Sequence, residues 1–113
     1  MAKSLTQINH ELKEFVGLLT KSYDVFAVVL YGSYVKGKAN DLSDVDVAVF
    51  SDDFGKDTFE EMKSLFKLRR KIDTDIEPLP FTKKAYFEHE KADFVSEILS
   101  KGKVVYKDGQ ILI

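Results

Sequence analysis

The sequence predicts an α/β domain, more strictly α+β, in which a small mixed β-sheet is flanked by helices. Two observations support this prediction. Apolar residues recur at helical spacing in three long stretches, and short apolar or alternating runs typical of strands lie between those stretches. The chain has 113 residues, which is the usual length of one domain, so we expect residues 1–113 to fold as a single domain.

The first helix is predicted over residues 4–22, with Ser4 or Thr6 as its cap. Its apolar residues, spaced three and four apart, form one face: Leu5, Ile8, Leu12, Phe15, Val16 and Leu19. Residues 25–31 form a nearly continuous, valine-rich apolar run that is short for a helix. We therefore expect a strand buried on both faces there, ended by Gly32 and followed by a polar stretch and a loop through residue 43.

The second strand is predicted over residues 44–50, where side chains alternate between two faces. Asp44 and Asp46 share one face, and the opposite face carries Val45, Val47 and Val49. After a loop, residues 57–71 are predicted to form a helix. Its apolar stripe is expected to contain Phe59, Met62, Leu65 and Phe66.

A third strand is predicted over residues 72–79, with Asp73, Asp75 and Glu77 on one face. Two prolines follow closely and are expected to end this strand or to restrict it to a sheet edge: Pro78 and Pro80.

The last third of the chain is predicted to contain a helix over residues 83–101, broken near Lys91, and a hairpin. The hairpin arms are residues 104–106 and 111–113, joined by Asp108-Gly109. Part of the helix's apolar face is expected to exceed what the sheet covers and to support oligomerisation or partner docking. That face comprises Phe87, Phe94, Val95, Ile98 and Leu99.

The composition restricts the classes of function. With 44% hydrophobic and 32% charged residues, the chain is typical of a globular protein, and its net charge of −2 does not indicate nucleic-acid binding. Cysteine is absent, so disulfides and thiolate metal sites are excluded. There is no apolar run of about eighteen residues and no signal-type core, so we expect a soluble cytoplasmic domain without membrane contact.

The two first strands bring together residues suited to phosphate and metal chemistry. Gly32 lacks a side chain, so a phosphate can approach its backbone, and the Ser33 hydroxyl can donate to the same phosphate. Asp44 and Asp46 have Cα atoms about 6.6 Å apart on one strand face and can together bind one or two divalent cations. Taken alone, such a pair is more typical of a solvated strand start; the upstream Gly-Ser turn favours a metal and phosphate site. A third carboxylate on a neighbouring strand would deprotonate or orient an attacking hydroxyl, or complete a second metal site.

The same residues resemble a known family signature. The run Leu30-Tyr31-Gly32-Ser33, followed after ten residues by Asp44-Val45-Asp46, resembles that of the minimal nucleotidyltransferases of the DNA polymerase β-like superfamily. Lys36-Gly37 and Ser43 are similar to the family's intervening residues. The resemblance continues more weakly through residues 76–81 and the last helix, so it covers most of the chain.

The resemblance implies transfer of a nucleoside monophosphate, AMP from ATP, to a hydroxyl acceptor with release of pyrophosphate. Asp44 and Asp46 would be metal ligands for Mg²⁺, expected as two ions, and Gly32 and Ser33 would hold the triphosphate. Glu77 looks closest to the family's third acid, with Asp75 as a rival and Asp73 third. Lys36 would contact a phosphate, although a solvated loop lysine fits equally well. Tyr34 would border the nucleotide.

The resemblance also implies a partner. Larger relatives add a helical domain for which 113 residues leave no room, so a partner chain or self-association would complete the acceptor side. Minimal members often pair with a helical HEPN protein as toxin and antitoxin, and some adenylylate a tyrosine of that toxin.

Two other functions remain open at this stage. The first is an antitoxin that neutralises its partner by occlusion, with little or no catalysis. The second is a flavodoxin-like module. The second is disfavoured because such folds place acids at strand carboxyl ends, whereas Asp44 and Asp46 open their strand. His10, His89 and the basic run 67–71 are expected to be surface residues rather than ligands.

Overall fold

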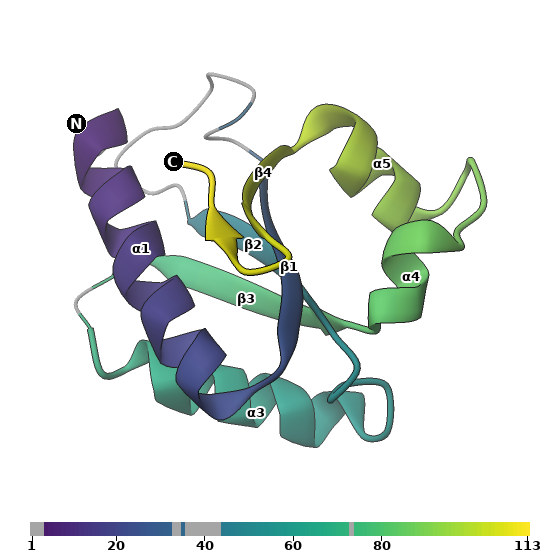
Figure 1. Ribbon diagram of the computed structural model, residues 1–113, viewed down its shortest axis with the longest axis horizontal. Coiled ribbons are helices and arrows are strands. Elements are labelled where there is room, and N and C mark those ends of the chain that lie inside the picture. The colour runs from purple at the N-terminus through teal and green to yellow at the C-terminus, as the bar shows by residue number, and fades with distance from the viewer. Residues whose placement is uncertain (1–3, 33–34, 36–43, 73) are drawn as a thin grey trace.

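The computed structural model describes residues 4–32, 35, 44–72 and 74–113 of the chain. Within these residues, five strands form one mixed sheet in the order β3-β2-β1-β4-β5, with helices on both of its faces (Figure 1). The predicted fold class is therefore confirmed. In chain order the elements are α1 (Leu5–Ser22), β1 (Val25–Tyr31), β2 (Val45–Ser51), α3 (Thr58–Arg69), β3 (Ile76–Phe81), α4 (Lys83–Phe87), α5 (Phe94–Lys101), β4 (Lys103–Lys107) and β5 (Gln110–Ile111).

The sheet has an antiparallel centre and one parallel edge. β1 pairs antiparallel with β2 on one side and with β4 on the other, whereas β2 pairs parallel with β3. β3 is an edge strand, which explains why it tolerates two prolines. Of the two predicted effects of these prolines, ending the strand or restricting it to a sheet edge, the second is observed. The predicted start of this strand at residue 72 is wrong. Backbone hydrogen bonds from Lys71 to Leu68 and from Ile72 to Arg69 continue the turn after α3, so β3 begins only at Ile76.

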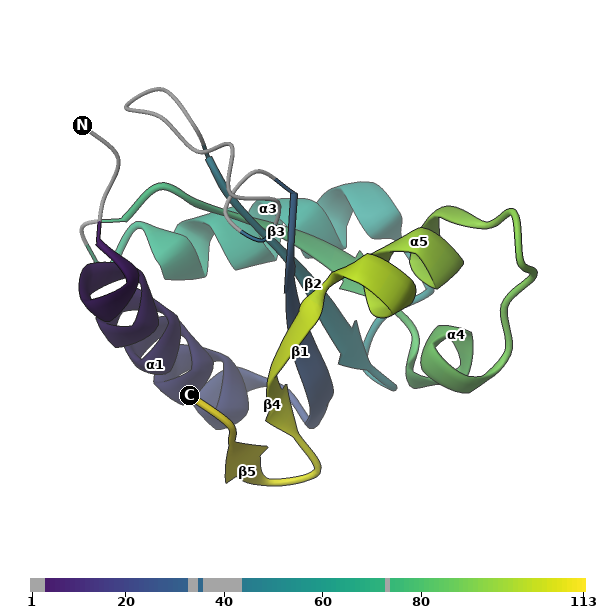
Figure 2. The same cartoon turned by 90° about the horizontal axis from the view of Figure 1, so that it is seen from above.

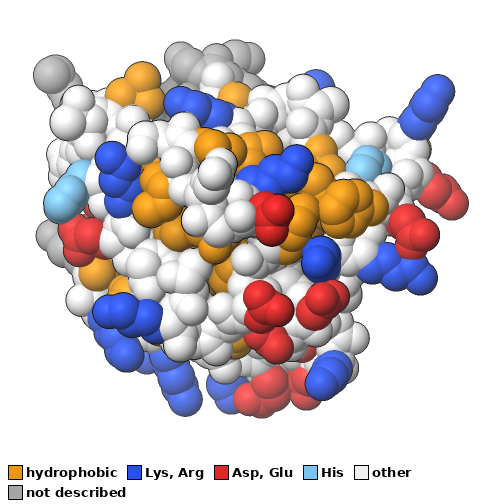
Figure 3. Space-filling model, in the orientation of Figure 1, with side chains coloured by type: hydrophobic (Ala, Val, Ile, Leu, Met, Phe, Trp, Pro, Cys, Tyr) orange, Lys and Arg blue, Asp and Glu red, His pale blue; other side chains and the backbone are white. Residues whose placement is uncertain are grey.

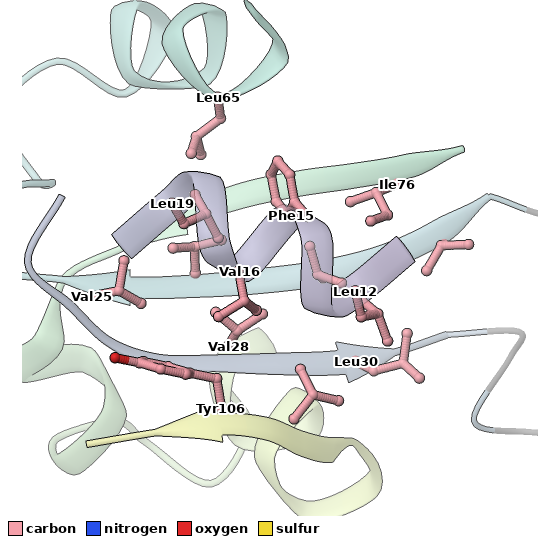
Figure 4. Packing of buried hydrophobic residues seen from close by; sticks show 14 of the residues in the cluster. Leu12, Phe15, Val16, Leu19, Val25, Val28, Leu30, Leu65, Ile76 and Tyr106 are labelled. Carbon is pink, nitrogen blue, oxygen red and sulfur yellow. The ribbon is translucent and has the colours of Figure 1, made fainter. Parts of the chain in front are cut away.

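One face of the sheet is covered by α1 and α3 (Figure 2). Ser4 caps α1, as predicted, by accepting the Gln7 N–H at 3.2 Å. In the close view, α1 side chains lie against β1 and β3 while Leu65 approaches from α3 (Figure 4). The buried residues that α1 contributes are Ile8, Glu11, Leu12, Phe15, Val16 and Leu19. Leu5, also predicted for this face, is 64% exposed.

The predicted apolar stripe of α3 is partly wrong. Its buried residues are Leu65 and Leu68, whereas Phe59 is 70% exposed. At about 100° per residue, Phe59 lies about 120° around the helix from Leu65, so both cannot face the sheet.

The opposite face of the sheet is covered by α4 and α5. Ala48 and Phe50 project to this face and Val45, Val47 and Val49 to the other, which confirms the predicted alternation of the second strand. The predicted helix over 83–101 is broken into α4 and α5 by residues 88–93, a gap that includes Lys91. Val95 and Ile98 are buried, while Phe87 and Phe94 are 62% and 49% exposed.

The chain ends in the predicted hairpin. Asp108 and Gly109 both have positive φ angles, 48° and 87°, which suit a tight two-residue turn between β4 and β5. Hydrophobic side chains form a band across the middle of the face seen in Figure 3, between α1 and α4. Every helix in the described ranges is too short or too polar to cross a lipid bilayer.

Candidate active site

Three polar side chains lie in a row across neighbouring strands. Asp46 of β2 is paired with Tyr31 of β1 on one side and with Glu77 of β3 on the other. Paired residues on strands about 4.8 Å apart project from the same face. Because Asp46 alternates in phase with Ala48, this row points to the face that α4 and α5 cover. The register of two different strand pairs therefore brings together residues that are far apart in sequence.

Asp44 joins this row, and we call Asp44, Asp46 and Glu77 the carboxylate cluster. Burial raises the pKa of Asp46, and the neighbouring Asp44 charge raises it further. Burial likewise raises the pKa of Glu77, helped by the charges of Asp44 and Asp46 and by a side-chain hydrogen bond with Asp44, although Arg69 opposes the rise. Burial, followed by Asp46 and Glu77, raises the pKa of Tyr31 to about 12, so its hydroxyl stays protonated. The cluster thus concentrates negative charge at one place.

Gly32 follows the row directly and lies against it. Its φ angle is +83°, and a Cβ atom built on it would collide with Oδ2 of Asp46. The Val35 N–H donates to the Gly32 carbonyl at 3.1 Å, so the chain turns there. From the sequence we expected that the absence of a side chain at Gly32 leaves room for a phosphate. In the structure it also leaves room for the Asp46 carboxylate.

The start of β3 is fixed by hydrogen bonds on both sides. The Asp75 carbonyl accepts the Val45 N–H at 3.0 Å, and the Thr74 hydroxyl accepts the Ile76 N–H at 3.2 Å. Arg69 of α3 donates through Nε to the Ile76 carbonyl. These bonds set the register in which Glu77 lies beside Asp46.

Glu77 is therefore the candidate third acid that the structure pairs with Asp46. Its rival Asp75 precedes the paired segment, with an exposed side chain. The following residues, named in the sequence analysis, lie outside the described residues: Ser33, Tyr34, Lys36, Gly37, Ser43 and Asp73.

The donor set of the carboxylate cluster suits a hard divalent cation. Carboxylate oxygens are the ligands that Mg²⁺ prefers, and a cation would reverse the repulsion that raises these pKa values. Among the residues described, no three acidic or imidazole side chains already enclose a metal-sized space.

A cavity of about 220 Å³ opens next to Gly32, between the end of β1 and α5. Its lining consists of Tyr31, Gly32, Val35, Phe94, Glu97, Ile98 and Lys101. Sequence reasoning missed Glu97 and Lys101, because nothing in helical periodicity indicates which end of α5 approaches β1. Tyr31 carried a usable signal, since it directly precedes Gly32 and alternates in phase with the buried residues of β1.

Both histidines and two further cavities lie away from the carboxylate cluster. His10 is an exposed partner of Glu14 on α1, and the ring of His89 lies 3.0 Å from the Ala85 carbonyl, so both are surface residues as expected. One further cavity lies along the exposed side of α3, and another lies near Asp24 and Lys83.

Comparison with known proteins agrees with this geometry. Residues 13–110 match the family model of the polymerase β nucleotidyltransferases. The chain is 31% identical over 70 residues to a Methanocaldococcus jannaschii protein named as a candidate protein adenylyltransferase, which covers 62% of this chain and 70% of the relative.

Solved structures share the fold at lower identity. A candidate nucleotidyltransferase from Sulfolobus solfataricus superposes with a TM-score of 0.71 at 16% identity, covering 96% of this chain and 89% of the other. A toxin–antitoxin structure with AMP-PNP gives 0.58 at 18% identity, over 88% of this chain and 73% of the other. A mutant of the toxin–antitoxin MntA–HpeT gives 0.57 at 21% identity, over 86% and 72%.

The family match spans nearly all of the described sheet, including β2 and β3, which carry Asp46 and Glu77, and Gly32, which follows β1. The chain therefore belongs to the polymerase β nucleotidyltransferase family and is a nucleotidyltransferase.

Proposed function

We propose that this nucleotidyltransferase uses Mg²⁺ to transfer AMP from ATP to a hydroxyl group of a protein, with release of pyrophosphate. The observation that carries the proposal is the carboxylate cluster, in which Asp46 lies between Glu77 and the glycine turn. The name of the M. jannaschii relative, a protein adenylyltransferase, supports the choice of AMP and of a protein acceptor.

In this proposal the carboxylate cluster binds the metal, and the glycine turn binds the phosphates of ATP. Asp44, Asp46 and Glu77 would hold the metal, expected as two ions, which would neutralise phosphate charge and lower the barrier to attack on phosphorus. Gly32 and Ser33 would hold the triphosphate, with Lys36 as a further phosphate contact. The positive φ angle of Gly32 turns the backbone away at the end of β1, beside the cluster.

The transfer itself is a single exchange at the α-phosphorus. The acceptor oxygen forms a bond to this phosphorus, and the bond from the phosphorus to the oxygen bridging the α- and β-phosphates breaks. Pyrophosphate leaves with that electron pair. Glu77 accepts the hydroxyl proton, a role open to a carboxylate that lies directly beside Asp46 on the neighbouring strand. Tyr31 stays protonated beside Asp46 and keeps a hydrogen-bond donor in the row.

The acceptor would be supplied by a partner chain. Solved structures of similar fold include toxin–antitoxin assemblies, one of them with AMP-PNP. By analogy, we propose a small helical HEPN-type protein as partner and acceptor, or a second copy of this chain. Phe87, which is 62% exposed, would form part of the contact.

Labelled ATP tests the proposal. The protein is incubated with Mg²⁺, cell extract and ATP carrying the label on the α-phosphate or, separately, on the γ-phosphate. We expect a protein to acquire the α-label and not the γ-label, and the double variant Asp44→Asn/Asp46→Asn to transfer neither. Glu90→Gln, which removes one exposed acid far along the chain from the cluster, should transfer like the wild type.

Two results would contradict the proposal. A labelled product formed equally by the double variant would show that Asp44 and Asp46 do not carry the chemistry. A chain that binds and neutralises its partner without labelling anything would be an antitoxin that acts by occlusion.

A further inference from the structure

The cavity beside Gly32 has two chemically different parts. Tyr31 and Phe94 meet edge to face in its wall, with ring centres 5.8 Å apart and an interplanar angle of 86°. Ile98, which is 2% exposed, extends this apolar wall. Glu97 and Lys101, one turn apart on α5, form an ion pair of 3.3 Å and are more than half exposed. The cavity therefore joins ring-bearing apolar walls to a charged pair on the solvent side.

The cavity begins at the row that carries Asp46. Tyr31 lines the cavity and is the β1 partner of Asp46, and Gly32, which follows β1, lies both in the cavity wall and against Asp46. In the proposed transfer the acceptor oxygen and the leaving pyrophosphate lie on opposite sides of the α-phosphorus, so the nucleoside extends to the side of that line. A nucleoside bound next to the carboxylate cluster therefore has this cavity beside it.

A nucleobase matches the two parts of this cavity. Its faces are flat and stack on aromatic side chains, and its edge carries hydrogen-bonding groups. A carboxylate accepts hydrogen bonds from exocyclic amino groups and cannot donate to a carbonyl oxygen. Lys101 lies 3.3 Å from the Glu97 carboxylate, so the acceptor and its charged neighbour both lie at the edge of the cavity.

On the basis of the function proposed above, we propose that this cavity receives the base of the triphosphate. Phe94 and Tyr31 contact the ring, and Glu97 accepts the exocyclic amino group. Glu97 thus determines a preference for a 6-aminopurine over a 6-oxopurine, that is, for ATP over ITP.

Calorimetry with three probes and Mg²⁺ separates the parts of the site. Tripolyphosphate carries the phosphates without a base, and the α,β-methylene analogues of ATP and ITP differ at the 6-position. The variants are Phe94→Leu and Glu97→Gln. The matched control is Glu88→Gln, which removes the acid of a similar ion pair, Lys84–Glu88 at 3.5 Å, on α4.

We expect Phe94→Leu to weaken both purine analogues about tenfold and to leave tripolyphosphate binding unchanged. Glu97→Gln should reduce the preference for the ATP analogue about tenfold, because an amide both donates and accepts. Glu88→Gln should match the wild type for all three probes. A melting curve shows whether Phe94→Leu is folded, and Glu97 is exposed enough that its variant tests the idea independently.

Two outcomes overturn the inference in different ways. If both variants bind the purine analogues with wild-type affinity and preference while Asp46→Asn weakens tripolyphosphate, the base lies elsewhere and the proposed function stands. If Asp46→Asn binds tripolyphosphate as tightly as the wild type, the proposed function fails, and the base cavity with it.

Discussion

The carboxylate of Asp46 lies beside two other acids and against the backbone of Gly32. Like charges on adjacent strands oppose folding, so this residue costs stability in the protein without metal. A residue that costs stability yet sits at the centre of a site is typical of function rather than of packing.

Replacing Asp46 with Asn should therefore stabilise the metal-free protein. We expect the free energy of unfolding at pH 7 to rise by roughly 0.2–1 kcal/mol, as denaturant titration would measure it. The folded-state pKa of Asp46 is raised, so its penalty is absent below the ordinary value near 3.8 and complete above the raised value. The gain should accordingly shrink as the pH falls. An equal gain from Glu90→Gln, or a loss from Asp46→Asn, would contradict this view of the cluster.

Gly32 allows a second test at the residue scale. Gly32→Ala combines a positive φ angle with a collision against Asp46, whereas Gly109→Ala has a φ angle of +87° and no atom within 4 Å of the new Cβ. Both should lose about 1 kcal/mol of unfolding free energy from strain, and Gly32→Ala should lose somewhat more, because the Asp46 carboxylate must also shift to make room for the new Cβ. Denaturant titration compares them directly. Equal losses would contradict the prediction that displacing this carboxylate adds to the strain.

At the scale of elements, the loop before α3 is held by the Glu61 carboxylate of that helix. Glu61 accepts three backbone N–H groups of the preceding loop, from Gly55, Lys56 and Asp57, at 3.0–3.2 Å. Burial pushes the pKa of Glu61 up, but these hydrogen bonds and Lys56 outweigh it, so the pKa lies below its ordinary value of 4.5. The loop is thereby fixed to the first turns of α3.

Glu61→Gln should loosen this connection in a pH-dependent way. Because the folded-state pKa is lowered, the stabilisation is fully present above about pH 4.5 and is lost as the pH falls through the lowered value. We expect the melting temperature at pH 7 to fall by roughly 2–4 °C, and the difference to disappear in acid. Thermal denaturation followed from pH 3 to pH 7 measures it. Glu60→Gln, next to it in the same turn, should show no comparable trend.

Strand and helix positions followed from sequence where one element's own pattern determined them. The alternation of β2 and the apolar run of β1 specified which residues are buried, and the structure agrees. The start of β3 was misjudged because backbone hydrogen bonds continue the turn after α3. Alternation of polar and apolar residues in the sequence does not reveal such bonds. The exposed Phe59 was misjudged because it lies about 120° around α3 from the buried Leu65, so the predicted stripe was too wide for one helix face.

At the scale of the whole molecule, the site depends on how separate elements meet. The spacing of Gly32 and Asp46 on consecutive strands sufficed to predict that they lie together. The pairing of Glu77 with Asp46 was anticipated through resemblance and alternation, while its register depends on the parallel pairing of β2 with β3. Glu97 and Lys101 were out of reach, because the way α5 crosses the sheet is set by packing of Val95 and Ile98.

We predict that one end of this sheet binds a magnesium–nucleotide complex through its carboxylates. Isothermal titration calorimetry of Mg²⁺-ATP against the wild type, Asp44→Asn/Asp46→Asn and Glu90→Gln tests this most directly. We expect the double variant to bind at least about tenfold more weakly than the wild type, a loss of about 1.4 kcal/mol or more, and Glu90→Gln to bind unchanged. Equal affinity of all three proteins for Mg²⁺-ATP would contradict the account.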